Sequence, residues 1–290
     1  KLHLYYSHLD WGREDYPQGR TGLGTGRDKG KANWSSYYKF MNTQLTELLT
    51  HYGPIGAVWF DGWWDHDSDA KPFDWQLPEQ YAMIHRLQPQ CLIGNNHHQT
   101  PFPGEDIQIF ERDLPGENKA GLSGQNISRL PLESCRTIND HWGYNLTDDN
   151  YKSPKELIQM LVRAAGKNAN LLLNIGPEPG GALPSLALDR LQAIGKWLNK
   201  YGETIYGTRG GIVAPHDWGI STQRGNKLYI HILNCMDSSL FIPTGNHKIK
   251  SATVFGTNKR INFTKTGNGI TLNLDTIPTD IDYIVELTLG

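Results

Sequence analysis

Short apolar runs alternate with amphipathic segments through about the first 210 residues of the chain. The apolar runs predict strands over residues 2–6, 55–60, 91–96, 107–110 and 170–177. Between them, apolar residues recur at helical spacing over residues 38–52, 78–87, 154–164 and 184–201. Alternation of strands and helices is typical of βα units that build a parallel sheet.

Two of these helices have clear boundaries in the sequence. The first is expected to end at Gly53-Pro54, and the third begins at the capping box Ser153-Pro154-Lys155-Glu156, with proline at the first helical position. In the first helix the residues at helical spacing are Met41, Leu45, Leu48, Leu49 and Tyr52. The third helix is predicted to turn Leu157, Met160, Leu161 and Ala164 inward.

The pattern changes after Gly210-Gly211, where helical periodicity stops. Short apolar runs separated by turn residues follow over residues 227–233, 251–255, 270–274 and 283–287, which predicts an all-β module. We therefore predict two domains, an α/β part over residues 1–211 and a β domain over residues 212–290.

The strand–helix alternation fits either a closed (β/α)8-like barrel or an open doubly wound sheet. No G-x-G-x-x-G or P-loop motif follows a predicted strand, which lowers the weight of a nucleotide-binding sheet. Polar residues gather at the carboxyl ends of the predicted strands, namely Tyr6, Asp61, residues 95–98, Glu111 and Asn174, which favours the barrel. Because the chain starts inside a predicted strand, we expect further barrel strands upstream of Lys1.

The composition narrows the function further. A formal charge of −2 without any block of Lys or Arg argues against nucleic acid as a partner, and no apolar run is long enough to predict membrane insertion. The three cysteines lie far apart and are interpreted as structural thiols. Nine Trp and thirteen Tyr, many of them beside polar residues, suit carbohydrate, whose apolar faces stack on aromatic rings.

Asp61 is the strongest candidate for a catalytic carboxylate, because it follows a buried strand and is flanked by Trp59, Trp63 and Trp64. A strand end is a rigid place from which a nucleophile reaches an anomeric carbon. A retaining glycosidase also needs a second carboxyl group that acts first as acid and then as base. The candidates for it are Glu105, Asp106, Glu111, Asp113, Glu117 and Glu133. Glu117 lies in a flexible loop and Glu133 precedes an extended segment, and the residues alone leave the choice between these two open.

The run Asn95-Asn96-His97-His98 supplies donors and acceptors suited to sugar hydroxyls. Adjacent histidines on an extended chain point in different directions, and no H-E-x-x-H or Cys/His spacing accompanies them, so no metal site is predicted. A Ser/His/Asp triad is disfavoured because the chain has no G-x-S-x-G elbow.

The chain resembles the α-L-fucosidases of glycoside hydrolase family 29. The resemblance rests on Leu4-Tyr5-Tyr6-Ser7 with Asp10-Trp11, Val58-Trp59-Phe60-Asp61-Gly62, Leu132-Glu133-Ser134-Cys135 with Trp142-Gly143-Tyr144, Asn170-Leu171-Leu172-Leu173-Asn174-Ile175-Gly176-Pro177, and the segment from Gly195 to Thr208. These stretches occur in family order across residues 4–211, and their combination is far more specific than any one of them.

The resemblance implies a catalytic mechanism and a set of site residues. Asp61 is then the nucleophile of a double displacement that retains anomeric configuration, and the acid/base falls near Glu117, with Glu133 in reserve. The walls of the fucose pocket are expected to be Tyr6, Trp59, His97 and Trp142.

The resemblance also implies properties of the whole protein. It implies a C-terminal antiparallel β-sandwich, no cofactor, fucosylated oligosaccharides or glycoconjugates as partners, and a periplasmic or secreted location. The alternative is a catalytically inactive barrel that only binds fucose or another carbohydrate.

Overall fold

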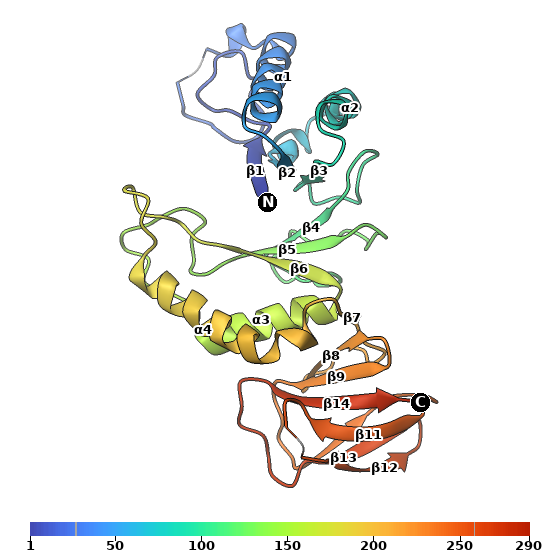
Figure 1. The fold of residues 1–290 in the computed structure, drawn as a ribbon. Helices are drawn as coiled ribbons and strands as arrows, with labels where there is room; N and C mark the ends of the chain where they lie inside the picture. The colour runs from blue at the N-terminus through green and yellow to red at the C-terminus, as the bar shows by residue number, and fades with distance from the viewer. Residues whose placement is uncertain (27, 258) are drawn as a thin grey trace. The chain divides into compact units, whose positions relative to one another are not determined.

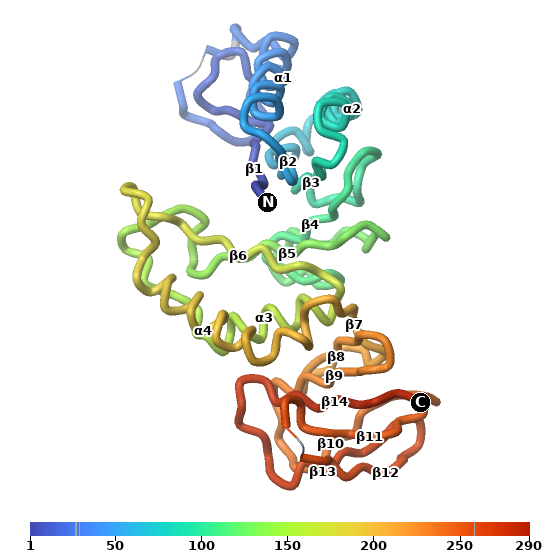
Figure 2. The backbone as a smooth tube through the Cα atoms, viewed as in Figure 1, coloured from blue at the N-terminus to red at the C-terminus, as the bar shows by residue number. Residues whose placement is uncertain are grey.

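The computed structural model describes residues 1–26, 28–257 and 259–290 and has a mixed α/β fold (Figure 1). The chain forms two compact units, Lys1–Glu133 and Ser134–Gly290. The backbone trace runs from β1 at the amino terminus to β14 at the carboxyl terminus (Figure 2).

The first unit is built on parallel strands, as predicted. The order β1-β2-β3 places β2 in the middle, and both of its ladders are parallel. An isolated parallel bridge from Gly94 to Ile107 continues the ladder towards β4. The strands are β1 (Leu2–Ser7), β2 (Ile55–Asp61), β3 (Leu92–Asn95) and β4 (Gln108–Glu111).

The helices of the first unit are α1 (Trp34–His51) and α2 (Leu77–Leu87), with single 3-10 turns at η1 (Lys29–Lys31) and η2 (Trp63–His66). Helix α1 begins four residues earlier than predicted, because the Asn33 side chain caps it by accepting a hydrogen bond from the Ser36 backbone N–H. Tyr52, the last residue of the predicted apolar spacing, is the C-cap residue of this helix and is 62% exposed.

The two faces of the β1-β2-β3 sheet have different surroundings. Val58 and Phe60 lie on the face that packs against Met41 and Leu45 of α1 and Ile84 of α2, where the core of this unit lies. Successive side chains of a strand point to opposite faces. Tyr5 of β1 and Trp59 and Asp61 of β2, which have the other parity, therefore lie on the face away from that core.

The second unit begins with helices and strands that follow one another. Strand β5 (Leu132–Thr137) starts at the end of the first unit and is a neighbour of β6 (Ala169–Asn174). Helix α3 (Pro154–Gly166) starts at the predicted capping box, which the structure confirms: the Glu156 N–H donates to Ser153 Oγ, and the Ser153 N–H donates to Glu156 Oε2. Helix α4 (Ser185–Tyr201) and the turn η3 (Gly202–Thr204) come next.

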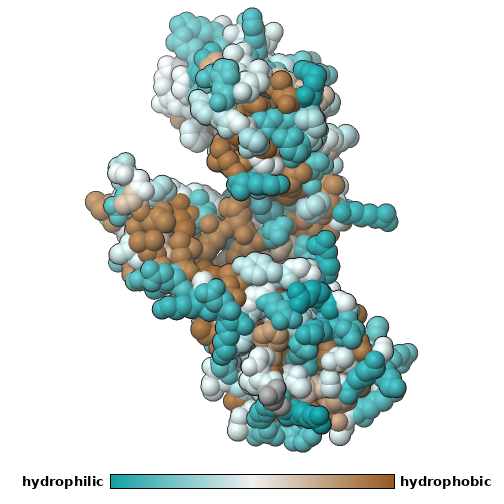
Figure 3. Space-filling view, viewed as in Figure 1, coloured by the Kyte–Doolittle hydropathy of each residue, from teal (hydrophilic) through white to brown (hydrophobic). Residues whose placement is uncertain are grey.

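Beyond η3 the described residues form strands in two antiparallel sheets, ordered β11-β14-β9-β8-β7 and β10-β13-β12. One hydrophobic cluster contains Leu228 and Val285 of the larger sheet and Ile242 and Leu272 of the smaller. Polar and neutral side chains predominate on the visible surface of this strand-rich part (Figure 3). The strands are β7 (Arg209–Gly210), β8 (Gly219–Arg224), β9 (Lys227–Ile232), β10 (Ser239–Ile242), β11 (Ile249–Val254), β12 (Asn262–Thr266), β13 (Gly269–Asn273) and β14 (Tyr283–Leu289).

Helices α3 and α4 pack against the larger of these sheets. Ile158 and Val162 of α3 and Trp197 of α4 share a cluster with Ile220 and Tyr229. This packing explains why the helices and the strands that follow them form a single compact unit. The chain changes from helices to strands near residue 211, as the sequence predicts. That a domain boundary lies there stays a prediction.

Candidate active site

The carboxyl ends of β1 and β2 and the residue after β3 lie side by side and hold Asp61. Asp61 is the last residue of β2 and pairs in register with Ser7 of β1. The His8 N–H donates to the Asp61 carbonyl oxygen at 2.7 Å, and the Asn96 N–H donates to the Phe60 carbonyl oxygen at 2.8 Å. The backbone on both sides of Asp61 is therefore fixed by neighbouring strands.

The Asp61 carboxylate receives hydrogen bonds from several elements. Its Oδ2 accepts from the Tyr5 hydroxyl at 2.8 Å. Its Oδ1 accepts from the Gly62 backbone N–H and from Trp64 Nε1, each at 2.9 Å, and Asn96 Nδ2 lies 3.4 Å away. Burial and the adjacent Asp61 charge raise the pKa of Tyr5, so its hydroxyl remains a donor. These donors fix the orientation of the carboxylate on a rigid strand.

Glu111, at the end of β4, adjoins Asp61 through Asn96. Asn96 Nδ2 donates to Glu111 Oε2 at 2.7 Å, and His98 Nε2 lies 3.1 Å from the same oxygen. Burial opposes ionisation of Glu111, but the hydrogen bonds from His98 and Asn96 outweigh it and lower the pKa of that carboxyl. Glu111 is therefore held as a charged acceptor beside the nucleophile candidate.

Glu133 lies inside β5 rather than before an extended segment. Trp59 Nε1 donates to Glu133 Oε1 at 2.8 Å, and the Trp59 ring stacks on Tyr5 with centroids 5.6 Å apart. Burial raises the pKa of Glu133, and the Trp59 hydrogen bond only partly offsets it. A chain of side-chain contacts through Trp59 and Tyr5 thus links Glu133 to Asp61.

Glu117 lies on the loop that follows β4. Its backbone N–H donates to the Leu114 carbonyl oxygen at 2.9 Å, which closes a turn, and its carboxylate lies 3.2 Å from Lys119 Nζ. The Glu117 side chain is 22% exposed and that of Lys119 is 81% exposed. Glu117 therefore forms an ion pair at the surface of the loop.

Two of the predicted pocket residues occupy different surroundings from Asp61. The Tyr6 hydroxyl donates to Gln44 Oε1 of α1 at 2.7 Å, and its ring packs on Phe60, so Tyr6 faces the helices. His97 is buried, and its Nε2 lies 3.0 Å from both oxygens of Glu105. Because the Gln99 N–H donates to His97 Nδ1, the proton of a neutral His97 ring is on Nε2.

The remaining predicted pocket residues are Trp59 and Trp142. Trp59 lies on the same strand face as Asp61, two residues earlier. Trp142 belongs to the second unit, in the segment after β5, and its role in the pocket stays a prediction.

The structure adds Tyr5, Trp64 and Asn96 to the residues around Asp61. Trp64 and Asn96 stood in segments already singled out in the sequence, as a flanking aromatic residue and as part of the polar run after a strand. Tyr5 precedes the predicted pocket residue Tyr6 in the sequence. Only the strand register tells which of the two lies beside Asp61: Tyr5 pairs with Trp59, whereas Tyr6 pairs with Phe60.

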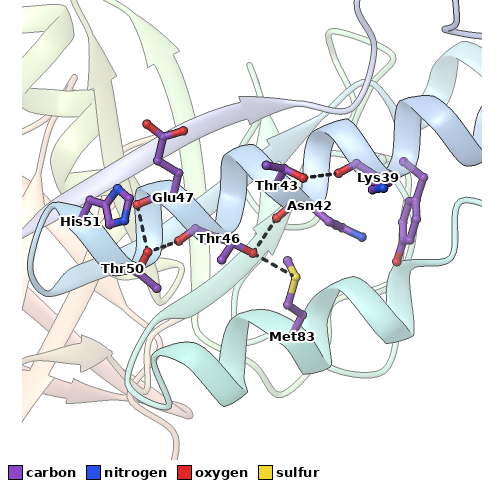
Figure 4. Close-up of a pocket in the computed structure, with 9 residues that line it drawn as sticks. Lys39, Asn42, Thr43, Thr46, Glu47, Thr50, His51 and Met83 are labelled. Carbon is purple, nitrogen blue, oxygen red and sulfur yellow. Dashed lines mark hydrogen bonds between the residues drawn. The ribbon is translucent and has the colours of Figure 1, made fainter.

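A separate hollow of about 660 Å³ lies between α1 and α2 (Figure 4). Its threonine hydroxyls are used within the helix, since Thr43 donates to the Lys39 carbonyl and Thr46 to the Asn42 carbonyl. Thr46 also faces Met83 of α2. This hollow has no buried carboxylate among its lining residues and is not a candidate for the chemistry.

Among residues 1–26, 28–257 and 259–290, no group of three or more His, Cys, Asp or Glu side chains is arranged to hold a metal ion. Within the same residues, no helix has the length and apolar character needed to cross a membrane.

A family model described as alpha-L-fucosidase matches residues 1–203. Among curated proteins, the chain is 28% identical to a putative α-L-fucosidase of Caenorhabditis elegans, with 71% of this chain and 40% of the relative covered. It is 26% identical to the α-L-fucosidase of Dictyostelium discoideum, with 98% and 62% covered, and 30% identical to the plasma α-L-fucosidase of Rattus norvegicus, with 78% and 48% covered. The matches thus extend over 40% to 62% of the length of these relatives.

Solved structures of α-L-fucosidases also resemble the chain. The α-L-fucosidase isoenzyme 1 of Paenibacillus thiaminolyticus is 33% identical, with a TM-score of 0.82 over 99% of this chain and 71% of that one. A family 29 α-L-fucosidase of Bacteroides thetaiotaomicron is 25% identical, with a TM-score of 0.82 over 99% and 68%. That structure holds a covalent intermediate trapped with 2-fluoro-fucosyl fluoride in a Glu-to-Gln mutant.

Proposed function

The chain belongs to the α-L-fucosidase family, and from this premise we propose that it is the catalytic part of a retaining exo-α-L-fucosidase. The substrates would be fucosylated oligosaccharides or glycoconjugates that carry a terminal α-L-fucose. The observation that carries the proposal is the Asp61 carboxylate, which hydrogen bonds from Tyr5, Gly62 and Trp64 hold at the end of a rigid strand. The binding-only alternative is not favoured, because a carboxylate held in this way suits nucleophilic attack.

In the first step, Asp61 attacks the anomeric carbon of fucose and forms a fucosyl ester while the glycosidic oxygen leaves with a proton from the acid. Oδ1 already accepts from Gly62 and Trp64, whereas Oδ2 accepts from Tyr5, so we assign the attack to Oδ2. In the second step, the same acid/base takes a proton from water, and the water oxygen attacks the anomeric carbon and releases Asp61. The two inversions give net retention.

For the acid/base we propose Glu117, with Glu133 as the alternative. The loop position of Glu117 supports it, since a loop carboxyl can approach the glycosidic oxygen of a bound sugar. A different observation supports Glu133: burial raises its pKa, which suits a group that must be protonated before the first step. A separation of about 5–5.5 Å from Asp61 in the complex with substrate is what retention requires of either residue.

Several properties of the whole protein belong to the same proposal. We propose that the parallel strands of the first unit are part of a (β/α)8-like barrel and that residues 212–290 form a β-sandwich domain. A periplasmic or secreted location, expected from the family resemblance, is a prediction that fractionation of the source cells would check.

The nucleophile is tested by hydrolysis of an aryl α-L-fucoside and by labelling with 2-fluoro-fucosyl fluoride. We expect Asp61→Ala to abolish turnover, and we expect mass spectrometry to locate the fucosyl adduct of the unsubstituted protein on the peptide that contains Asp61. Near-native turnover by Asp61→Ala, or an adduct on another peptide, would overturn the assignment. Proton NMR of the first-formed product checks retention, because the product must be the α-anomer.

The acid/base is tested by azide rescue, since a small anion replaces water without needing a general base. We expect Glu117→Ala to lose most of its activity on fucosides with a poor leaving group, because their departing oxygen needs a proton. On an aryl fucoside whose leaving group departs without a proton, we expect azide to restore turnover and to give a fucosyl azide of inverted configuration relative to the ester. Rescue of Glu133→Ala in place of Glu117→Ala would move the role to Glu133.

A further inference from the structure

The loop that follows β1 starts beside the proposed nucleophile. The His8 N–H donates to the Asp61 carbonyl oxygen, and a Cβ placed on Gly62 would lie 3.0 Å from Leu9 Cδ2. Trp11 comes three residues after His8, and three residues of fully extended chain span at most about 11 Å. Trp11 therefore lies close to the carboxyl end of β2.

The Trp11 ring is held in place although it is 46% exposed. Its Nε1 donates to Thr21 Oγ1 at 3.1 Å. A Cβ placed on Gly22 would lie 2.3 Å from Trp11 Cδ1, so a side chain at this position would displace the ring. Gly22 also has a φ of +67°, which glycine adopts without strain.

The residues that hold Trp11 are anchored in turn to the segment that follows Asp61. Thr21 donates from both its backbone N–H and its hydroxyl to Oδ1 of Asp65, a fully buried residue of η2. The Tyr16 hydroxyl donates to Asp65 Oδ2 at 2.7 Å. Because η2 also carries Trp64, one short turn orients both the nucleophile and the loop that holds Trp11.

We propose that Trp11 is a stacking platform for the sugar ring to which the fucose is attached, on the leaving-group side of Asp61. An aromatic side chain that is half exposed presents an apolar surface to a ligand, and one that is already fixed loses little conformational entropy when the ligand binds. Pyranose rings have apolar faces that pack on an indole, while their hydroxyls remain in water. The inference rests on the proposed function, since a leaving-group sugar exists only if fucosides are cleaved.

The test compares two substrates in the intact protein and its Trp11→Ala variant. One substrate is a fucosylated oligosaccharide and the other is fucosyl fluoride, whose leaving group has no sugar ring to stack. We expect kcat/KM for the oligosaccharide to fall about tenfold more than kcat/KM for the fluoride, and Trp11→Phe to recover part of the loss. Tyr52→Ala is the control, because Tyr52 is an exposed aromatic residue, 62% exposed against 46% for Trp11, that precedes β2 at the opposite end of that strand.

The anchor of the ring gives a second variant pair. Thr21→Val removes the hydroxyl that accepts from Trp11 and donates to Asp65, whereas Thr21→Ser keeps both bonds. We therefore expect the valine variant alone to lose more kcat/KM on the oligosaccharide than on the fluoride. Equal losses of kcat/KM on both substrates in Trp11→Ala would show that Trp11 has a purely structural role and would overturn the proposal. Full activity of Trp11→Ala on both substrates would overturn it as well. Failure of the unsubstituted protein to hydrolyse fucosyl fluoride would instead refute the proposed function.

Discussion

His8 makes the stability of the first unit depend on pH. Its side chain is fully buried, with its ring stacked on Phe60 at 4.4 Å between centroids. Gln80 Nε2 donates to Asn42, so Gln80 Oε1 acts as the acceptor for His8 Nε2, at 2.7 Å, and His8 Nδ1 has no hydrogen-bond partner in the structure. Burial lowers the pKa of His8 from 6.5 to about 4, because a charged imidazole in this site would be poorly solvated.

The size of the effect follows from linkage. A histidine with a lower pKa in the folded state binds protons more weakly there than in the unfolded chain, so its contribution is complete above pH 6.5 and is lost as the pH falls through 4. With about 1.4 kcal/mol for each pKa unit, the full loss is about 3 kcal/mol. Between pH 7 and about pH 4.5, we expect a loss of about 2 kcal/mol from His8 alone.

The assay is urea denaturation at these two pH values for the unsubstituted protein and for His8→Gln, whose amide can still donate to Gln80. Both proteins share every other titrating group, so the difference between their pH dependences isolates His8. We expect the free energy of unfolding of His8→Gln to fall by about 2 kcal/mol less on acidification, whatever its value at pH 7. Identical pH dependences would refute the reasoning and would mean that His8 is protonated without cost in the folded protein.

Three further predictions test the site and the fold. Trp64→Phe removes a donor to Asp61 Oδ1 and should lower kcat/KM for an aryl fucoside about tenfold or more. The control is Trp34→Phe, which removes a hydrogen bond to Gln76 and should leave kcat/KM unchanged. Equal losses in the two variants would mean that the assay reports only lost packing. His98→Phe should raise the pKa of Glu111, because it removes a hydrogen bond to the charged carboxylate. Carbon-13 NMR of labelled glutamate measures this pKa, and an unchanged titration of Glu111 would contradict the prediction. Ser153→Ala should cost about 1 kcal/mol of unfolding free energy in denaturant melts, whereas Ser185→Ala, at the start of a helix without a side-chain cap, should change it by less than about 0.5 kcal/mol; similar costs would contradict the capping argument.

Much of the fold could be predicted because local signals and burial agree. The capping box at Ser153 marks the start of α3, and the buried run ahead of Asp61 forms the central strand. The apolar spacing predicts a helix that starts at Tyr38, whereas α1 starts at Trp34, because Asn33 is its N-cap and accepts from the Ser36 N–H. A polar N-cap residue outside the apolar pattern therefore helps to locate the start of a helix as much as the apolar residues within it.

The site was harder to predict because it depends on register. Residues of one parity in β2 place Trp59 and Asp61 on the same face, which the sequence alone indicates. Whether Tyr5 or Tyr6 joins them depends on how β1 pairs with β2, and a slip of one residue exchanges the two. Similarly, the contact between Trp59 and Glu133 joins residues far apart in sequence, and no local pattern predicts it.

The same register connects the stability of the fold with the proposed chemistry. The donors to the Asp61 side chain come from β1, from η2 and from the residue after β3, so the carboxylate is oriented only when all three segments are in place. The His8 backbone bond to Asp61 fixes the end of β1, and the buried His8 ring keeps that end packed on Phe60. Protonation of His8 would then disturb the position of Tyr5 before the unit unfolds. Activity should therefore fall at a higher pH than the unfolding transition in the unsubstituted protein, and the two should move closer together in His8→Gln.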